Sequence, residues 1–322
     1  MPSPDWHSAG KTQGMRLCAA LVGAMLLTAG TAGAEGEAQR CTRRIAQTLG
    51  LDWRERYRDL QPDETPASKV AVWLESPIAI RTLASFINAR FNTQPATNSY
   101  EDAVYSAAVY VLTNKLPWSE LYLGRLRIDG TNGQVFPDPD ARALGYFGSK
   151  DWQFRYKGNE PNGVMLSAAY RTMQNTIGLK LIPSPINGQG DASATGRERS
   201  DCRGCHYDSA YALDKVARLL PKRVGFGGGA KIEVGPVAPQ TLFGGTIESY
   251  EALVERLVHS EAFGFWTCRL AFEFVYGRPE SACEGPIFDR CTQAFEQAGS
   301  MAAAVESLLV APEFCAATEG TP

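Results

Sequence analysis

The stretch Cys202-Arg203-Gly204-Cys205-His206 places two thiols and an imidazole at the spacing of a c-type haem attachment motif. Each cysteine sulfur can add across one vinyl group of haem, and the two residues between them match the distance between the vinyl groups. His206 then falls under the ring, where its neutral imidazole can bind the iron as the proximal ligand. The motif predicts one covalent haem c on Cys202 and Cys205. A redox-active Cys-x-x-Cys pair beside an incidental histidine is the alternative.

The N-terminal residues are typical of a secretory signal. Met15-Arg16 precedes an apolar run from Leu17 to Thr28, and Ala32-Gly33-Ala34 is a small-residue cleavage site. The run is shorter than the about 20 apolar residues that a membrane-spanning helix needs. We therefore expect a signal peptide over residues 1–34, with Met15 as the favoured start. The mature chain would begin at Glu35, carry no membrane span and be exported to the periplasm or exterior of a bacterium.

The charge of the mature chain bears on its partners. Asp5, Lys11 and Arg16 are lost with the signal, which leaves 30 of the 32 basic and 34 of the 35 acidic side chains. The resulting formal charge of −4 argues against nucleic acid or an anionic membrane as a partner. It is compatible with docking to a redox partner protein, which the sequence does not identify.

The remaining cysteines predict disulfides. They are Cys41, Cys268, Cys283, Cys291 and Cys315. In an oxidising compartment most of them should pair. Cys283 and Cys291 enclose a Glu-Gly-Pro turn and could close a short loop, while Cys268 and Cys315 lie in neighbouring predicted helices. That pairing would leave Cys41 as the odd thiol, although sequence alone does not determine connectivity. A structural metal site made by these cysteines is the alternative, but their spacing fits no paired Cys-x2-Cys pattern.

Apolar residues at intervals of three and four predict a mainly α, multi-helix fold. Helices are expected over 68–74, 78–91, 99–114, 163–177, 208–220, 246–276, 287–298 and 301–310, with Pro77 between the first two and a break near Gly264. The Gly- and Pro-rich segments 126–162, 182–200 and 221–245 are expected to be long connections, the first with a small hairpin. We divide the mature chain into a helical region, 35–199, and a haem-bearing region, 200–318.

The sixth iron ligand is expected to decide the chemistry, because its identity sets the reduction potential and whether the iron is open to small molecules. Met173 fits the apolar stripe of a helix, and His259 lies on a charged helix face. Met165 stands beside Ala168 and Ala169, whose small side chains could admit the edge of a haem. Met165 is therefore the leading protein candidate for the sixth ligand. Met173, His259 and an open iron position remain alternatives.

Several short motifs besides Cys-x-x-Cys-His are informative together. They are Ala212-Leu213-Asp214, Leu242-Phe243-Gly244-Gly245, Leu253 to Ser260 with Phe263, Cys268, Phe274 to Arg278, and Leu308 to Phe314, with Gly145-Tyr146-Phe147, Gly158-Asn159-Glu160 and Gly196-Arg197 upstream. Over about residues 200–315, this series resembles the cytochrome c-like proteins of planctomycetes, myxobacteria and related bacteria, whose C-terminal modules are domains of unknown function. The resemblance implies a secreted, helical, haem-bearing protein with a multi-helix, cytochrome c-like architecture, and it implies no substrate.

Three functions follow from these observations as hypotheses. The leading one is a mono-haem c-type cytochrome that transfers single electrons. The second is a haem oxidoreductase, with peroxidase-like chemistry at an open iron site, for which the sequence names no catalytic residue. The third is a disulfide-rich secreted binding module whose Cys-x-x-Cys-His motif holds no haem.

Overall fold

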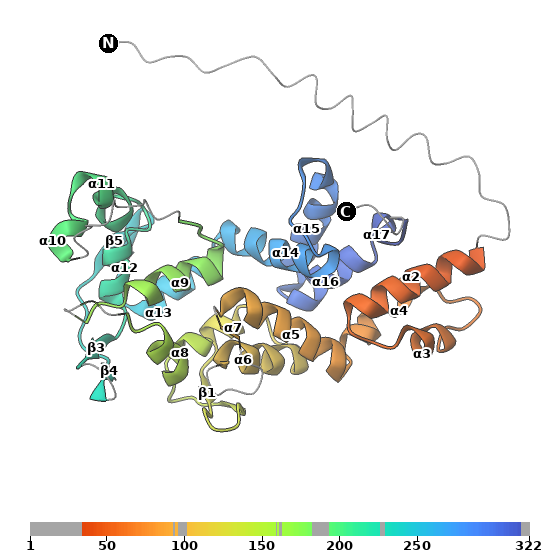
Figure 1. Cartoon of the computed structure of the whole chain (residues 1–322), viewed down its shortest axis with the longest axis horizontal. Coiled ribbons are helices and arrows are strands. Elements are labelled where there is room, and N and C mark those ends of the chain that lie inside the picture. Colours follow the sequence, from red (N-terminus) through yellow and green to blue (C-terminus); the bar gives the residue numbers. More distant parts are fainter. Residues whose placement is uncertain are drawn as a thin grey trace, which may run out of the picture.

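The computed structural model describes residues 34–92, 94–95, 102–158, 160, 163–181, 193–225 and 229–316. Helices dominate this part of the chain, which confirms the expected mainly α fold class (Figure 1). Residues 1–33 of the expected signal segment, with Met15 and the apolar run from Leu17, lie outside the described residues. Among the residues that are described, no single helix is long and apolar enough to cross a membrane. Two consecutive helices, Pro66–Leu74 and Pro77–Phe91, meet that criterion only together, with a bend of 74° between them.

The N-terminal part of the chain is a series of helices. They are α2 (Ala34–Thr48), α3 (Trp53–Arg58), α4 (Pro66–Leu74), α5 (Pro77–Phe91), α6 (Ala103–Thr113) and α7 (Glu120–Leu123). The Thr65 hydroxyl accepts a hydrogen bond from the Ser68 N–H at the start of α4, and the Ser76 hydroxyl accepts one from the Ala79 N–H at the start of α5. Proline suits the first position of both helices, because an N–H there would have no helical partner. Pro77 thus separates the two helices by opening the second.

The segment 126–162 contains more regular structure than expected. Strands β1 (Leu126–Ile128) and β2 (Val135–Pro137) form the expected antiparallel hairpin, and a 3-10 turn, η1 (Gly145–Gly148), and helix α8 (Lys150–Arg155) follow it. Helix α8 is short but anchored, because the Ser149 hydroxyl caps the N–H of Trp152 and the Trp152 ring is buried. Gly145 has a φ of +48°, and a Cβ there would overlap the backbone of Leu121. Only glycine therefore allows η1 to lie this close to α7.

The region around the haem motif consists of short elements. They are α10 (Ala194–Arg197), α11 (Ser200–Arg203), the π-helical turn η2 (Gly204–Asp208) and α12 (Leu213–Leu219), followed by the hairpins β3 (Lys222–Val224) with β4 (Lys231–Glu233) and β5 (Gln240–Leu242) with β6 (Gly245–Ile247). The predicted helix from 208 was placed too early, because Ser209 is extended and ends η2. The predicted connections 182–200 and 221–245 contain regular structure, since α10 lies in the first and β3, β4 and β5 lie in the second. The helix predicted from 246 was also placed too early, because β6 continues to Ile247 and the helix begins at Tyr250.

The C-terminal part returns to longer helices. They are α13 (Tyr250–Val258), α14 (Glu261–Tyr276), the turn η4 (Ala282–Glu284), α15 (Gly285–Ala298), α16 (Met301–Leu309) and α17 (Pro312–Ala316). The break expected near Gly264 is wrong, because the chain turns at His259 and Ser260 and α14 runs through Gly264. A Cβ at Gly264 would touch the Phe295 ring at 3.5 Å. The glycine therefore marks the close packing of α14 on α15 and does not interrupt the helix.

Helix α9 (Leu166–Ile177) ends at a buried polar centre that joins distant parts of the chain. The Asn175 carbonyl oxygen accepts hydrogen bonds from the Tyr122 hydroxyl at 2.9 Å and from the Trp266 indole N–H at 3.1 Å. The Asn175 side-chain amide donates to the Tyr146 hydroxyl at 2.8 Å. Gly178 closes the helix with a φ of +69°, and a Cβ there would overlap the Trp266 ring. Glycine at this position therefore lets Trp266 reach the end of α9.

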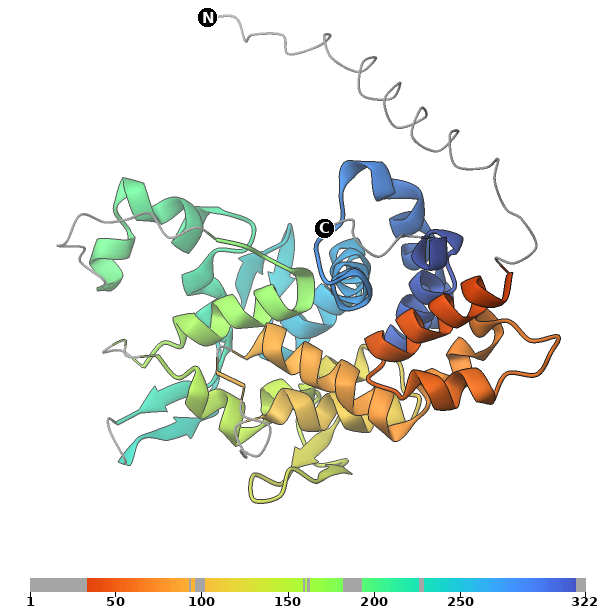
Figure 2. The same ribbon diagram turned by 45° about the vertical axis from the view of Figure 1, so that its right-hand side comes forward.

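One continuous hydrophobic core contains helices from both sides of residue 200. Helix α9 packs against α12, α13 and α14, while α4 packs against α16 and α2 against α17. Figures 1 and 2 both show α10 and α11 at one end of the long molecule and α2, α3 and α17 at the other. The haem motif is thus remote from the N-terminal helix and connected to the core through α12 and α9.

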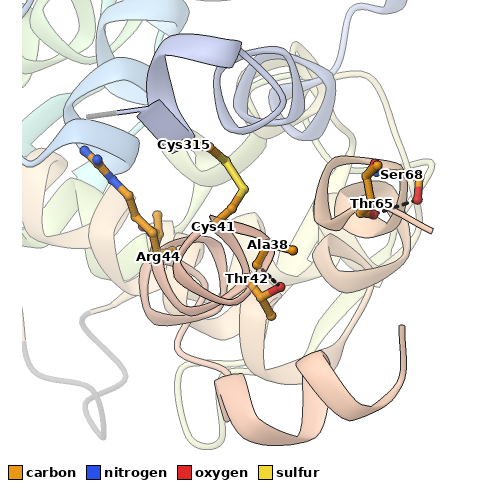
Figure 3. The surroundings of a disulfide bond; sticks show 8 residues. Ala38, Cys41, Thr42, Arg44, Thr65, Ser68 and Cys315 are labelled. Atoms are coloured by element: carbon orange, nitrogen blue, oxygen red, sulfur yellow. Dashed lines mark hydrogen bonds between the residues drawn. A yellow bond between two sulfur atoms is a disulfide. The ribbon is translucent and has the colours of Figure 1, made fainter. Parts of the chain in front are cut away.

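The disulfides differ from the expected pairing. Cys41 on α2 is bonded to Cys315 on α17 (Figure 3), and Cys268 on α14 is bonded to Cys291 on α15. The expected pairs of Cys283 with Cys291 and of Cys268 with Cys315 are therefore wrong, and Cys41 is not the odd thiol. The reason is that residues 285–298 form a helix. A rise of 1.5 Å per residue separates positions 283 and 291 by about 10 Å, beyond the reach of a disulfide.

These two disulfides, between cysteines of the described residues, are expected to stabilise the fold unequally. The bond between Cys41 and Cys315 closes a loop with a sequence separation of 274, whereas that between Cys268 and Cys291 spans 23. If loss of chain entropy dominates, the long loop contributes about 5 kcal/mol and the short one about 3 kcal/mol. Thermal unfolding of the two double Cys→Ala variants should show the larger loss for the Cys41 and Cys315 variant. Equal losses, or the reverse order, would contradict the entropic account.

Candidate haem-binding site

The haem motif forms a tight helical turn at the surface. Cys202 lies in the last turn of α11, and Cys205 and His206 lie in η2, where the Ser209 N–H donates to the Gly204 carbonyl at 2.9 Å. A hydrogen bond between residues i and i+5 defines a π-helical turn, a form that is often found at functional sites. Cys202 is half-buried, Cys205 is exposed, and neither is in a disulfide. Both thiols are therefore available for thioether formation.

The imidazole of His206 has one nitrogen engaged by the protein. Its Nδ1 lies 2.8 Å from Oδ2 of Asp214, in the first turn of α12. A metal-bound histidine in proteins almost always has its other ring nitrogen held in this way, by a carboxylate, a carbonyl or water. The hydrogen bond places the proton on Nδ1 and leaves the Nε2 lone pair of His206 for a metal. The donor set of two thiols and one oriented imidazole thus fits a covalent haem.

Asp214 is also bonded to Arg197 of α10. The Arg197 Nε lies 3.0 Å from Oδ2, and its Nη2 lies 2.8 Å from Oδ1. Both side chains are almost fully buried, with exposed fractions of 6% for Arg197 and 5% for Asp214. Burial by itself would raise the pKa of Asp214, but the hydrogen bonds from His206 and Arg197 outweigh it and hold the pKa below its usual value. The carboxylate is therefore ionised at neutral pH.

Tyr207 completes the surroundings of the Asp214 carboxylate. Its side chain is half-buried in η2, directly after the proposed iron ligand. Burial raises the pKa of Tyr207, and the negative charge of the Asp214 carboxylate raises it further. The phenol is therefore neutral at physiological pH, and Arg197 is the cation that balances Asp214.

The candidate sixth ligands occupy different surroundings. Met165, at the start of α9, and Met173, within it, are both fully buried in the hydrophobic core. His259 is exposed at the end of α13, where its Nδ1 lies 2.8 Å from the Glu255 carbonyl oxygen. Because α9 packs against α12, the two methionines lie on a helix that contacts the element holding Asp214. Met165 as the sixth ligand remains a prediction.

Two residues of the site were not predicted as functional. Asp214 stands in the Ala212-Leu213-Asp214 motif and Arg197 in the Gly196-Arg197 motif, so both belong to the segments that carry the resemblance described above. Among the residues that the structure describes, no group of three or more His, Cys, Asp and Glu side chains could hold a metal ion. A haem iron requires no such group, since the porphyrin supplies four ligands and the chain only the axial ones.

No protein-family model, curated protein or solved structure matches this chain.

The two ion pairs near the motif should differ sharply in their effect on stability. Arg197 and Asp214 are buried, whereas Arg203 and Asp208 have exposed fractions of 53% and 55%. Removing one partner of a buried pair leaves an uncompensated charge and costs about 3–5 kcal/mol, whereas an exposed pair contributes about 0–1 kcal/mol.

Asp214→Ala should therefore lower the free energy of unfolding by about 3–5 kcal/mol. The matched variant Asp208→Ala should lower it by about 1 kcal/mol or less. Urea denaturation of both variants, in the same state of haem loading, measures the difference. Similar losses in the two variants would contradict the burial that distinguishes the pairs.

Proposed function

We propose that this protein is an exported c-type haem protein with one haem c on Cys202 and Cys205 and His206 as the proximal iron ligand. The observation that carries the proposal is the hydrogen bond between His206 Nδ1 and Asp214, in a turn that also presents two thiols outside any disulfide. The bonds of Cys41 with Cys315 and of Cys268 with Cys291 are compatible with an oxidising compartment outside the cytoplasm. The resemblance to the cytochrome c-like proteins of planctomycetes and myxobacteria supports the same reading.

One-electron transfer is the function that we favour. Haem c supplies an iron that changes oxidation state by one electron. The chain contributes attachment at Cys202 and Cys205, an oriented imidazole at His206 and an ionised carboxylate behind it. Because Cys205 is exposed, a haem bound there would have one edge close to solvent and to a docked redox partner protein. A surface edge suits electron exchange between proteins.

Haem oxidoreductase chemistry at an open iron is the second candidate. It is favoured by the environments of the three possible sixth ligands. Met165 and Met173 are fully buried in the core, and His259 is exposed at the end of α13. If none of them binds the iron, its sixth position is free for peroxide or another small molecule.

Covalent haem attachment can be tested directly. The protein produced in a bacterium with haem-attachment machinery should retain its haem through acid-acetone extraction and gain the mass of one haem. The double variant Cys202→Ala/Cys205→Ala should lose covalent haem, whereas Cys268→Ala/Cys291→Ala should keep it, since those cysteines lie in a disulfide. Haem that is extracted from the unmodified protein would contradict covalent attachment, and protein without any haem would favour the binding module that holds none.

The oxidised spectrum separates electron transfer from haem enzyme chemistry. An electron carrier should be low-spin and six-coordinate, because a fixed ligand set minimises rearrangement when the iron changes charge. If Met165 is the sixth ligand, Met165→Leu should remove the thioether–iron absorption and leave haem attached. Met173→Leu is the control, because it also replaces a buried thioether of the same region. It should leave the thioether–iron absorption unchanged. A high-spin oxidised protein that binds cyanide readily would instead support the oxidoreductase.

A further inference from the structure

We propose that Asp214 and Arg197 are positioning residues that set the reduction potential of the iron through His206, with opposite signs. The inference rests on the proposed function, because it requires haem at the motif. Neither residue would touch the haem iron, and each would act through the next member of a chain of hydrogen bonds. That chain runs from Arg197 on α10 to Asp214 on α12 and on to His206 in η2.

The first link concerns the strength of the histidine as a ligand. The Asp214 carboxylate accepts a hydrogen bond from Nδ1 of His206 at 2.8 Å, and a negatively charged acceptor increases the electron density of the imidazole. A more basic Nε2 binds Fe(III) more strongly than Fe(II), because the oxidised iron carries the higher charge. Asp214 is therefore expected to favour the oxidised state and to lower the potential.

The second link limits that effect. The same carboxylate oxygen, Oδ2, receives both the His206 Nδ1–H at 2.8 Å and the Arg197 Nε–H at 3.0 Å. The guanidinium thus draws electron density from the oxygen that polarises the imidazole. It also adds a positive charge near the iron. Arg197 is therefore expected to raise the reduction potential. The two residues would thus make contributions of opposite sign to the potential of the iron.

Burial makes this balance effective. Arg197 and Asp214 are 6% and 5% exposed, so water and salt screen their charges only slightly. Arg203 and Asp208 form a second Arg–Asp pair around the same motif, but both are more than half exposed. Asp208 belongs to η2, where its carboxylate accepts hydrogen bonds from the Arg203 Nε–H. The second pair therefore provides a control with the same chemistry and nearly the same position in the chain.

A purely structural role for the buried pair predicts something different. If the pair only holds α10 against α12, loss of either partner would loosen the same contact and shift the potential in the same direction. The proposed role predicts shifts in opposite directions, because the two charges act oppositely on the imidazole. The sign of the shift therefore distinguishes the two roles.

The experiment uses the haem-loaded protein and the variants Asp214→Asn, Arg197→Gln, Asp214→Asn/Arg197→Gln and Asp208→Asn. Spectroelectrochemistry gives the midpoint potential of each, and haem content is measured alongside. We expect Asp214→Asn to shift the Fe(III)/Fe(II) equilibrium at least tenfold toward Fe(II), which is an increase of about 59 mV for one electron. Arg197→Gln should shift it toward Fe(III), and Asp208→Asn should change it less than threefold.

The double variant covers the case in which a single variant fails to fold, because it leaves no uncompensated buried charge. It should fold and have a higher potential than the unmodified protein, because Asp214 contacts His206 directly and its contribution exceeds that of Arg197, which acts through Asp214. A double variant with an unchanged potential would overturn the inference, as would shifts of the same sign in the two single variants. Unmodified protein without covalent haem would instead overturn the proposed function itself, so the two failures are distinguishable.

Discussion

The buried carbonyl of Asn175 is the contact on which much of the fold depends. A helix leaves its last carbonyl groups without helical partners, and a buried helix end must find donors elsewhere. Here the donors are a tyrosine hydroxyl from α7 and an indole N–H from α14, elements separated by more than a hundred residues in sequence. Satisfying one carbonyl therefore requires the N-terminal and C-terminal helices to meet at the end of α9. Aromatic rings fill the space around this contact. The ring of Tyr122 packs against those of Phe91, Tyr146, Phe147 and Phe263.

The haem motif depends on this core indirectly. Its own residues are exposed or half-buried, so they contribute little packing to hold their geometry. Order comes instead from Asp214, which is placed in the first turn of α12 and kept buried by the packing of α12 on α9. One carboxylate then fixes both the histidine that follows the cysteines and the arginine that precedes them. A surface turn with few apolar contacts is thus oriented by polar contacts to a buried residue.

The sequence predicts the elements that depend on local rules. The apolar periodicity locates α4, α5, α9, α15 and α16, and the prolines and capping residues explain where two of them begin. These local rules fail where tertiary packing determines the local structure. Helix α8 exists because Trp152 is drawn into the aromatic core, and Gly264 continues a helix because Phe295 packs against it. No local pattern pairs His206 with a carboxylate eight residues later, or that carboxylate with an arginine seventeen residues earlier. The disulfide partners were likewise unpredictable, since a helix between Cys283 and Cys291 changes which sulfur atoms meet.

The bond between Cys41 and Cys315 has a consequence for biogenesis. If the chain is exported N-terminus first, as proposed, Cys41 is the first cysteine of the described residues to leave the translocation channel and Cys315 is the last. Cys202 and Cys205 emerge between them as free thiols. Either thiolate can attack a mixed disulfide that Cys41 has formed with a disulfide-bonded oxidant of the compartment, which releases the oxidant's thiolate and leaves Cys41 bonded to the motif. Pairing in order of emergence would therefore join the N-terminal helix to the haem motif. The native protein requires a host that keeps Cys202 and Cys205 reduced, or attaches haem to them, before the two ends of the chain are joined.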